Sequence, residues 1–398
     1  VNLAAKARLD LDAESISWTG LAGETSGNVH LDTAMLRLGS SQNREVTGLP
    51  EAGSGVFNAN AQWIELFGAT RWDGFSQINL NSQHDLRTVG IRPFISDREF
   101  LGGMETAANL NLNASQIYPT TLSQFKFAVK NNPNGQINIA GENTDKSPLS
   151  AAGALSFEAP IINQACVLKA PFGTINLKAS SKLTLAENSL TSVSGAGQVI
   201  PFGVTQGGLD WLYPLDTLRN LVFNVPPEKK LLLQAPEVIL AEGSVVDLSG
   251  GGDLKSYEFL PGLGGDFNYL QPGSASYEGG FAVIPHLGSD LAPYDHFQAI
   301  NNQGSELGFG GKVYLAGTVK LHVGEYTKLP PHYALLPGAF LVTPQANTQD
   351  QAITTRTTDG LSIVAGYNTV AGTGTRDSRS SGFRIESGAN VRKNSEYE

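Results

Sequence analysis

The chain has 398 residues, a formal net charge of −10 and a pI near 5.2, and only 16% of its residues are charged. This acidic balance argues against nucleic acid or an anionic membrane as the main partner, because no basic stripe is present to neutralise phosphates. Hydrophobic residues make up 40% of the chain, and 18 Phe with 11 Tyr argue against disorder. No apolar run reaches the ~18 residues that a membrane-spanning helix needs.

Short stretches of alternating apolar and polar residues, bounded by Gly, Asn, Ser or Asp, recur along the chain and are typical of half-buried strands. Among them are Val29–Leu31, Ile78–Leu80, Leu110–Leu112, Ile137–Ile139, Ile175–Leu177 and Val313–Leu315. INLNSQHDL from Ile78 also aligns with INLKASSKL from Ile175, with a further apolar residue eight positions on in both, Leu86 and Leu183. This spacing predicts the coils of a parallel β-helix, roughly 20–25 residues each.

Two local features lie within this strand-rich part. Asn132-Pro133-Asn134-Gly135 is a turn signal between two strand patterns, and we expect Gly135 to need a positive φ. The only cysteine, Cys166, excludes an intrachain disulfide, and its apolar neighbours predict a buried core thiol.

A pair of matching eleven-residue stretches is the strongest sign of internal repetition. Leu185–Gly195 reads LAENSLTSVSG and Leu240–Gly250 reads LAEGSVVDLSG, with six of the eleven positions identical. Such self-similarity marks a repeat architecture in which each unit buries its apolar face against its neighbours. The 55-residue offset is too long for one coil, so we expect two coils of one solenoid separated by an outward excursion, centred on residues 211–225.

The rest of the chain departs from this pattern. Leu209–Phe223 is the best helical candidate, with Asp216 as N-cap. Residues 251–310 are rich in Gly, Tyr, Phe, Pro and Asp and lose the coil spacing, which favours a long ordered loop. The expected organisation is β-helix coils over 1–205, an inserted loop or short helix over 206–230, a coil over 231–250, the aromatic and Gly-rich loop over 251–310, and further coils with a polar tail over 311–398.

No set of residues predicts catalysis, a metal or a cofactor. The six histidines are scattered without metal-ligand spacing. Asp295-His296 beside Tyr294 is interpreted as a polar loop tip, because nothing nearby supplies a nucleophile or a third orienting group. Where the repeats align, Asp247 stands opposite Ser192, so no pair of carboxylates stacks for glycoside cleavage.

Two glycine runs need separate interpretation. Gly250–Asp253 and Gly262–Asp266 lack the tandem nonapeptide of a calcium-binding roll and the strand-then-helix context of a dinucleotide site. We interpret both as tight turns that let the backbone approach the solenoid wall.

Several stretches together resemble the carboxy-terminal region of the large filamentous-haemagglutinin-like exoproteins of Gram-negative bacteria, over about residues 100–345. They are Ala114–Thr121, Ala159–Ala179, Val245–Gly252 and, most specifically, Tyr326–Ala339, YTKLPPHYALLPGA. The resemblance implies a right-handed parallel β-helix, export through an outer-membrane partner channel by two-partner secretion, and adhesion or fibre formation at the bacterial cell surface. The amino-terminal secretion domain of that family is not visible, and no catalytic residues carry over. We expect the sequence to be a piece of a longer polypeptide.

These observations predict a secreted or surface-bound, non-catalytic structural or adhesive protein. Uncapped coil ends are open sheet edges, which favours self-association into a filament or larger assembly. Host or cell-surface glycans are the expected ligands, with Tyr257, Phe267 and Tyr269 as candidate contacts on an aromatic platform. The alternative is a polysaccharide-binding or polysaccharide-cleaving protein on the same fold.

Overall fold

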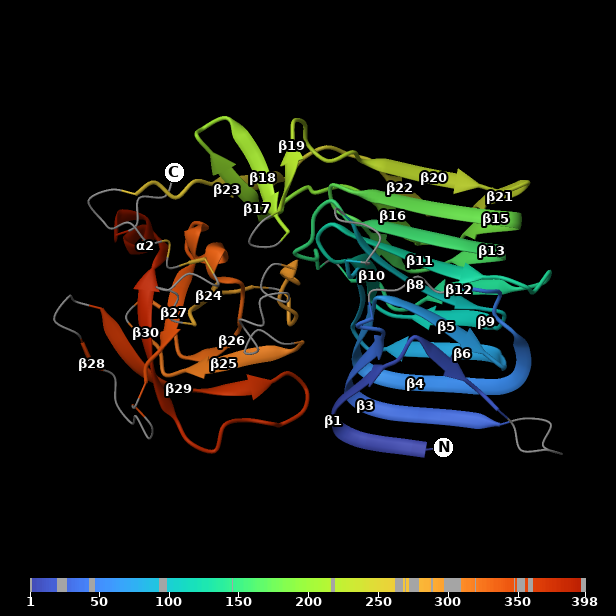
Figure 1. Cartoon of the computed structure of the whole chain (residues 1–398), viewed down its shortest axis with the longest axis horizontal. Helices are drawn as coiled ribbons and strands as arrows, with labels where there is room; N and C mark the ends of the chain where they lie inside the picture. The colour runs from blue at the N-terminus through green and yellow to red at the C-terminus, as the bar shows by residue number, and fades with distance from the viewer. Residues whose placement is uncertain are drawn as a thin grey trace. The chain divides into compact units, whose positions relative to one another are not determined.

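The computed structural model describes residues 2–19, 27–42, 47–92, 99–144, 146–215, 219–261, 268, 270–271, 279–287, 289–296, 309–318, 320–346, 348, 355–356 and 361–394. The structure is nearly all β, with 56% strand and 3% helix. No helix in these ranges is long and apolar enough to cross a membrane. The chain divides into two compact units, residues 1–198 with 227–252 and residues 199–226 with 253–398, and each is described by itself (Figure 1).

The first unit contains, among the described residues, one sheet of 19 strands that pair in parallel along three ladders. The first ladder comprises β2 (Ser15–Ser17), β5 (Ala69–Asp73), β8 (Phe100–Thr106), β11 (Ser123–Val129), the first halves of β13 (Ala154–Gln164) and β15 (Thr174–Leu185), and β20 (Lys230–Gln234).

The second ladder comprises the leading parts of β1 (Asn2–Asp12), β3 (Asn28–Gly39) and β4 (Ala52–Phe67), then β6 (Phe75–Ser82), β9 (Asn109–Asn113), β12 (Gln136–Ala140), the second halves of β13 and β15, and β21 (Glu237–Leu240). The third comprises the ends of β1, β3 and β4, then β7 (Asp85–Val89), β10 (Gln116–Pro119), β14 (Val167–Lys169), β16 (Leu190–Ser192) and β22 (Val245–Asp247). The chain visits the ladders in turn, except that no described strand joins the first ladder between β3 and β4 or the third ladder between β12 and β13. Figure 1 shows the strands of this unit stacked in chain order, from blue to yellow-green.

The core of this unit is made of columns of apolar side chains at matching register positions. One column in the second ladder is fully buried from strand to strand, and it comprises Ile78, Leu110, Ile137, Ile162 and Leu183. Phe127 and Phe157 stack in a first-ladder column, with ring centroids 4.9 Å apart. Burying each such side chain contributes about 1.5–3 kcal/mol. The alternating strands predicted from the sequence therefore form this core.

Asparagines form a matching column at the polar positions of the second ladder. Each amide nitrogen donates to the amide oxygen one strand earlier, at 2.6–2.8 Å, in the series Asn58, Asn79, Asn111, Asn138 and Asn163. Asn is disfavoured in ordinary strands, but here both its amide groups find partners in the stack. The asparagines within these strands therefore contribute side-chain bonds along the ladder.

The two matching eleven-residue stretches lie directly side by side. Leu185 pairs with Leu240, and Ser192 pairs with Asp247, whose carboxylate accepts from the Ser192 hydroxyl at 2.8 Å. The turns within them are the same: Asn188 and Gly243 have φ of 59° and 77°, a left-handed conformation that favours Asn and Gly. The prediction that the stretches form neighbouring layers separated by an excursion is confirmed.

The alignment of Ile78 with Ile175 places both in buried strand positions, as predicted, but the equivalence is wrong. Ile78 belongs to the second ladder through Leu110, whereas Ile175 pairs with Leu155 in the first ladder. All three ladders use the same apolar alternation, so a short match finds a strand without identifying its ladder.

The turn at Asn132–Gly135 is confirmed by a hydrogen bond from the Gly135 N–H to the Asn132 carbonyl at 3.0 Å. The expected positive φ is wrong for Gly135 and belongs instead to Asn131, at 56°. Gly135 is required for space, because a Cβ there would lie 2.4 Å from Cγ1 of Val129.

The second unit has a four-stranded and a seven-stranded sheet within the described ranges. The first contains β17 (Val199–Gln206), β18 (Asp210–Pro214), β19 (Asn220–Phe223) and β23 (Asp253–Tyr257). The second contains β24 (Phe281–Val283), β25 (Gly311–Leu315), β26 (Gly324–Thr327), β27 (Phe340–Pro344), β28 (Thr355–Arg356), β29 (Ser362–Val370) and β30 (Ser381–Ser387). A 3-10 helix, η2 (Pro331–Leu335), and α2 (Gly388–Asn394) complete it.

Two predictions fail in this unit. The helix over Leu209–Phe223 is wrong, because β18 and β19 pair antiparallel there, and Asp216 lies outside the described residues. Pro214 is unfavourable inside a helix, and Trp211 and Phe223 pack against Phe202 on the strand pair. The expected coils after residue 311 are also wrong, because the strands of the seven-stranded sheet pair antiparallel.

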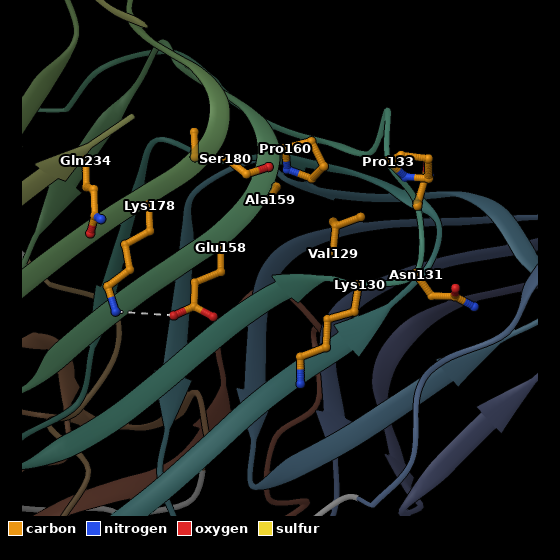
Figure 2. A pocket seen from close by; sticks show the side chains of 12 residues that line it. Val129, Lys130, Asn131, Pro133, Glu158, Ala159, Pro160, Lys178, Ser180 and Gln234 are labelled. Atoms are coloured by element: carbon orange, nitrogen blue, oxygen red, sulfur yellow. Dashed lines mark hydrogen bonds and ion pairs between the residues drawn. The ribbon is translucent and has the colours of Figure 1, made fainter. Parts of the chain in front are cut away.

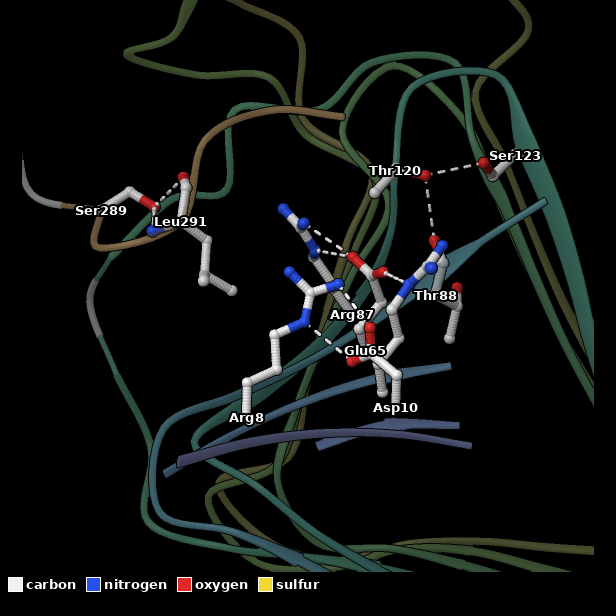
Figure 3. Close-up of polar contacts among 10 residues, drawn as sticks. Arg8, Asp10, Glu65, Arg87, Thr88, Thr120, Ser123, Ser289 and Leu291 are labelled. Carbon is white, nitrogen blue, oxygen red and sulfur yellow. Dashed lines mark hydrogen bonds and ion pairs between the residues drawn. The ribbon is translucent and has the colours of Figure 1, made fainter. Parts of the chain in front are cut away.

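A buried ion cluster lies in the first unit. The Glu65 carboxylate on β4 accepts from Arg37 at 2.6 Å and from Arg87 at 2.7 Å, and only 1% of Glu65 is exposed (Figure 3). Burial alone would raise the pKa of Glu65, but the guanidinium groups of Arg87 and Arg37 outweigh it and hold the pKa below its usual value.

Substituting Glu65→Gln should lower the free energy of unfolding by about 3–5 kcal/mol, because it removes the buried carboxylate that the Arg37 and Arg87 guanidinium groups both bind. The loss of unfolding free energy should be smaller in acid. Because the pKa of Glu65 is lower in the folded chain than in the unfolded chain, its stabilising contribution is complete above the ordinary carboxyl pKa. That contribution is lost as the pH falls through the folded-state pKa. Urea denaturation across this pH range measures both. Glu158→Gln, at an ion pair that is partly open to solvent, is the control, with a loss of about 1 kcal/mol or less. Equal losses in the two variants would contradict the assignment.

Leu185 and Leu240 occupy the same position in the two matching stretches and lie in neighbouring layers. Leu185→Ala should cost about 2–5 kcal/mol of unfolding free energy, because Leu185 is fully buried. Leu240→Ala, at the paired position in the next layer, should cost less than about 1 kcal/mol, because Leu240 is 59% exposed. Parallel urea titrations of the two variants, at a protein concentration where sedimentation shows monomers, measure the difference, and similar costs at the two sites would contradict this layer order.

Candidate functional site: a polar groove on the parallel sheet

A groove of about 690 Å³ lies on the outer surface of the first unit, where strands pass from the first ladder to the second (Figure 2). Its wall includes the turn after β11, from Lys130 to Pro133. β13 and β15 bend at the same level, because their register shifts between Ala159 and Ile161. Pro160 and Ser180 line the groove at these bends, and Gln234 lines it at the end of β20.

The charged side chains of the groove belong to a row of ion pairs on the first ladder. Glu158 binds Lys126 at 2.6 Å and Lys178 at 3.4 Å, and Lys130 binds Glu105 at 2.6 Å. Figure 2 shows the Lys178 and Glu158 side chains pointing toward one another across neighbouring strands. Burial acts to raise the pKa of Glu158, but the two lysines hold it below its usual value.

This arrangement favours binding of a polar ligand. Residues with ammonium, amide, hydroxyl and carboxylate groups line the groove together with apolar Val129, Ala159 and Pro160, so it offers donors, acceptors and apolar surface. A general acid for glycoside cleavage needs a raised pKa, and Glu158 has the opposite shift. Over the described ranges, no group of three or more His, Cys, Asp or Glu lies close enough to hold a metal ion.

The groove residues were missed by sequence reasoning. Sequence reasoning considered only carboxylates stacked on carboxylates. The first ladder instead places Glu158 directly opposite Lys178, one layer apart. Aligning opposite charges at outward positions, coil by coil, would have found this pair.

The predicted aromatic contacts are not brought into the groove. Tyr257 lies on β23 in the second unit and is half-buried, with its hydroxyl donating to the Leu335 carbonyl at 3.3 Å and the Arg392 guanidinium over its ring. Phe267 and Tyr269 lie outside the described residues. The platform that these three were expected to form therefore stays a prediction, and Tyr257 already has partners within its own unit.

The prediction that Asp295-His296 forms a polar loop tip is wrong. His296 is buried and its ring packs 5.0 Å from that of Tyr294. Asp295 lies 3.7 Å from Nδ1 of His332, and burial together with the Asp295 charge raises the pKa of Tyr333. Packing in the second unit therefore encloses a motif that looked solvent-exposed.

The two glycine runs have different outcomes. Gly251 and Gly252 have positive φ, and a Cβ on Gly252 would lie 1.9 Å from the Gly195 carbonyl oxygen, so a tight turn against the neighbouring layer is confirmed. The run Gly262–Asp266 was expected to behave likewise, and it lies outside the described residues.

Comparisons with known proteins find no matching family model, curated protein or solved structure. The class that the structure defines is an all-β protein with a large parallel sheet.

Cys166 should resist thiol reagents in the folded chain, because its side chain is fully buried and burial raises its pKa to about 12. An aromatic disulfide reagent at mildly alkaline pH should leave it unmodified until guanidinium unfolds the chain. A Leu49→Cys variant, at an exposed position, is the positive control and should react in the folded state. Stoichiometric modification of native Cys166 would contradict the burial.

Proposed function

We propose that the chain is a segment of a secreted or cell-surface structural and adhesive exoprotein, built on a right-handed parallel β-helix that acts as a rigid rod. The observation that carries the proposal is the return of the chain to the same three ladders, layer after layer. β5, β6 and β7 are followed by β8, β9 and β10, and later by β20, β21 and β22, each pairing parallel with its ladder.

The side-chain columns support a mechanical role. Apolar columns run inside the stack and the asparagine column runs along its polar face, so each layer is bonded to the next by backbone and side chains. In repeat architectures stability is close to a sum of such neighbour interactions, which makes the stack stiff along its length. The resemblance to filamentous-haemagglutinin-like exoproteins supports export through an outer-membrane partner channel and a place on the bacterial surface.

The polar groove supports passive adhesion to carbohydrate. Its lining can donate and accept hydrogen bonds over several layers, which suits an extended glycan. The ionised state of Glu158, between Lys126 and Lys178, favours binding over cleavage. Polysaccharide binding is thus part of the proposed function, and polysaccharide cleavage is the less favoured alternative.

Glycan binding by the purified chain tests the proposal. On an array of neutral and acidic oligosaccharides we expect binding to an extended glycan that weakens at least tenfold in Lys178→Ala, because Lys178 lines the groove. Lys182→Ala is the matched control: Lys182 lies on the same strand, outside the groove, in a 3.9 Å exposed ion pair. Absence of glycan binding, or equal loss in both variants, would count against adhesion through the groove. Release of reducing ends from a bound glycan would replace the adhesive role by catalysis.

A further inference from the structure

The last layer of the first unit leaves its core positions open. The buried column that ends at Leu183 continues in register to Val238, which is 41% exposed. Leu185 is fully buried, but its partner Leu240 is 59% exposed. Together with Leu248, these side chains form what we call the terminal face (Val238, Leu240 and Leu248).

The loss of burial is a property of the layer and not of the residue types. Val193 is fully buried, and Leu248, which aligns with it in the matching stretches, is 55% exposed. The turns in both stretches are the same, with Ser189 and Ser244 each donating a hydroxyl to the alanine three residues earlier at 2.7 Å. The two layers therefore fold alike, and they differ in having a further layer packed upon them.

The backbone at this face is open as well. β20, β21 and β22 pair on one side with β15 and β16, and on the other side no strand of the described ranges pairs with them. Unpaired strand edges beside exposed apolar side chains form a template for further association. This edge lies between described segments of the chain, and the chain continues beyond it.

We propose that the terminal face binds the same face of a second copy of the chain, an inference that rests on the rod proposed above. A partner that covers the terminal face must lie over the open edges of all three ladders at once. The last layer of a second copy has the same three edges and therefore a matching shape. The layer, residues 227–252, carries an open strand edge on each of the three ladders. A two-fold arrangement, the commonest among homo-oligomers, pairs apolar face with apolar face and requires no other surface.

Sedimentation analysis over a concentration series tests the association. The unmodified chain should form a dimer, and the double variant Leu240→Lys/Leu248→Lys should dimerise at least 100-fold more weakly, because it places charge on the terminal face. Leu49→Lys is the matched control, a charge at an exposed leucine (66%) outside the face, and should dimerise like the unmodified chain. Circular dichroism melting shows that the double variant is folded, as its positions are already exposed.

Cross-linking identifies the orientation. Leu240→Cys or Leu248→Cys should give a covalent dimer with a short bis-maleimide, whereas Leu49→Cys should not, and buried Cys166 takes no part. The inference is overturned if the unmodified chain is a monomer. In that case, free labelling of the thiol in Leu240→Cys would mean that nothing covers the terminal face, and protection of that thiol would mean that the chain itself covers it. Dimerisation that survives the double variant, or a dimer without same-position cross-links, also overturns it. A monomeric double variant that keeps its glycan binding leaves the adhesive proposal intact, so the two can fail separately.

Discussion

In-register stacking of parallel strands is the constraint on which the first unit depends. Each inward side chain has a neighbour of similar kind in the layer before and the layer after, as the column from Ile78 to Leu183 shows. Burial is complete only when both neighbours are present. This single requirement explains both the continuous core and the sudden exposure of Leu240 where a neighbour is missing.

The same stacking organises the polar side chains. An asparagine at one outward position bonds to an asparagine one layer away, because the ladder holds the two at strand spacing. Glu158 and Lys178 become partners for the same reason. The polar groove follows from a small departure from this regularity, since the register shift after Ala159 bends neighbouring strands and leaves a hollow beside the ion pairs.

Layered folding also tolerates long excursions. Ser192 and Asp247 are bonded across adjacent layers, although residues 199–226 between them belong to the second unit. In that unit antiparallel pairs replace the parallel ladders, and an aromatic cluster around Phe202 replaces the stacked columns. Pattern reasoning misassigned Leu209–Phe223 as a helix because the spacing of its leucines suits both structures. The pairing of Trp211 with Phe223 stabilises two strands in place of a helix, but it forms only once the chain has folded back on itself.

Sequence alone determined the all-β class, the alternating strands of the first unit, the buried Cys166 and the adjacency of the two matching stretches. These properties follow from alternation and self-similarity, which act over a few residues or between identical segments. Tertiary structure alone decided which ladder each strand joins, the enclosure of His296, the groove around Glu158 and the exposure of Leu240. The reason is physical: these features depend on what lies one layer away, and Leu185 and Leu240, at the same position of two similar sequences, differ in whether a further layer packs upon them.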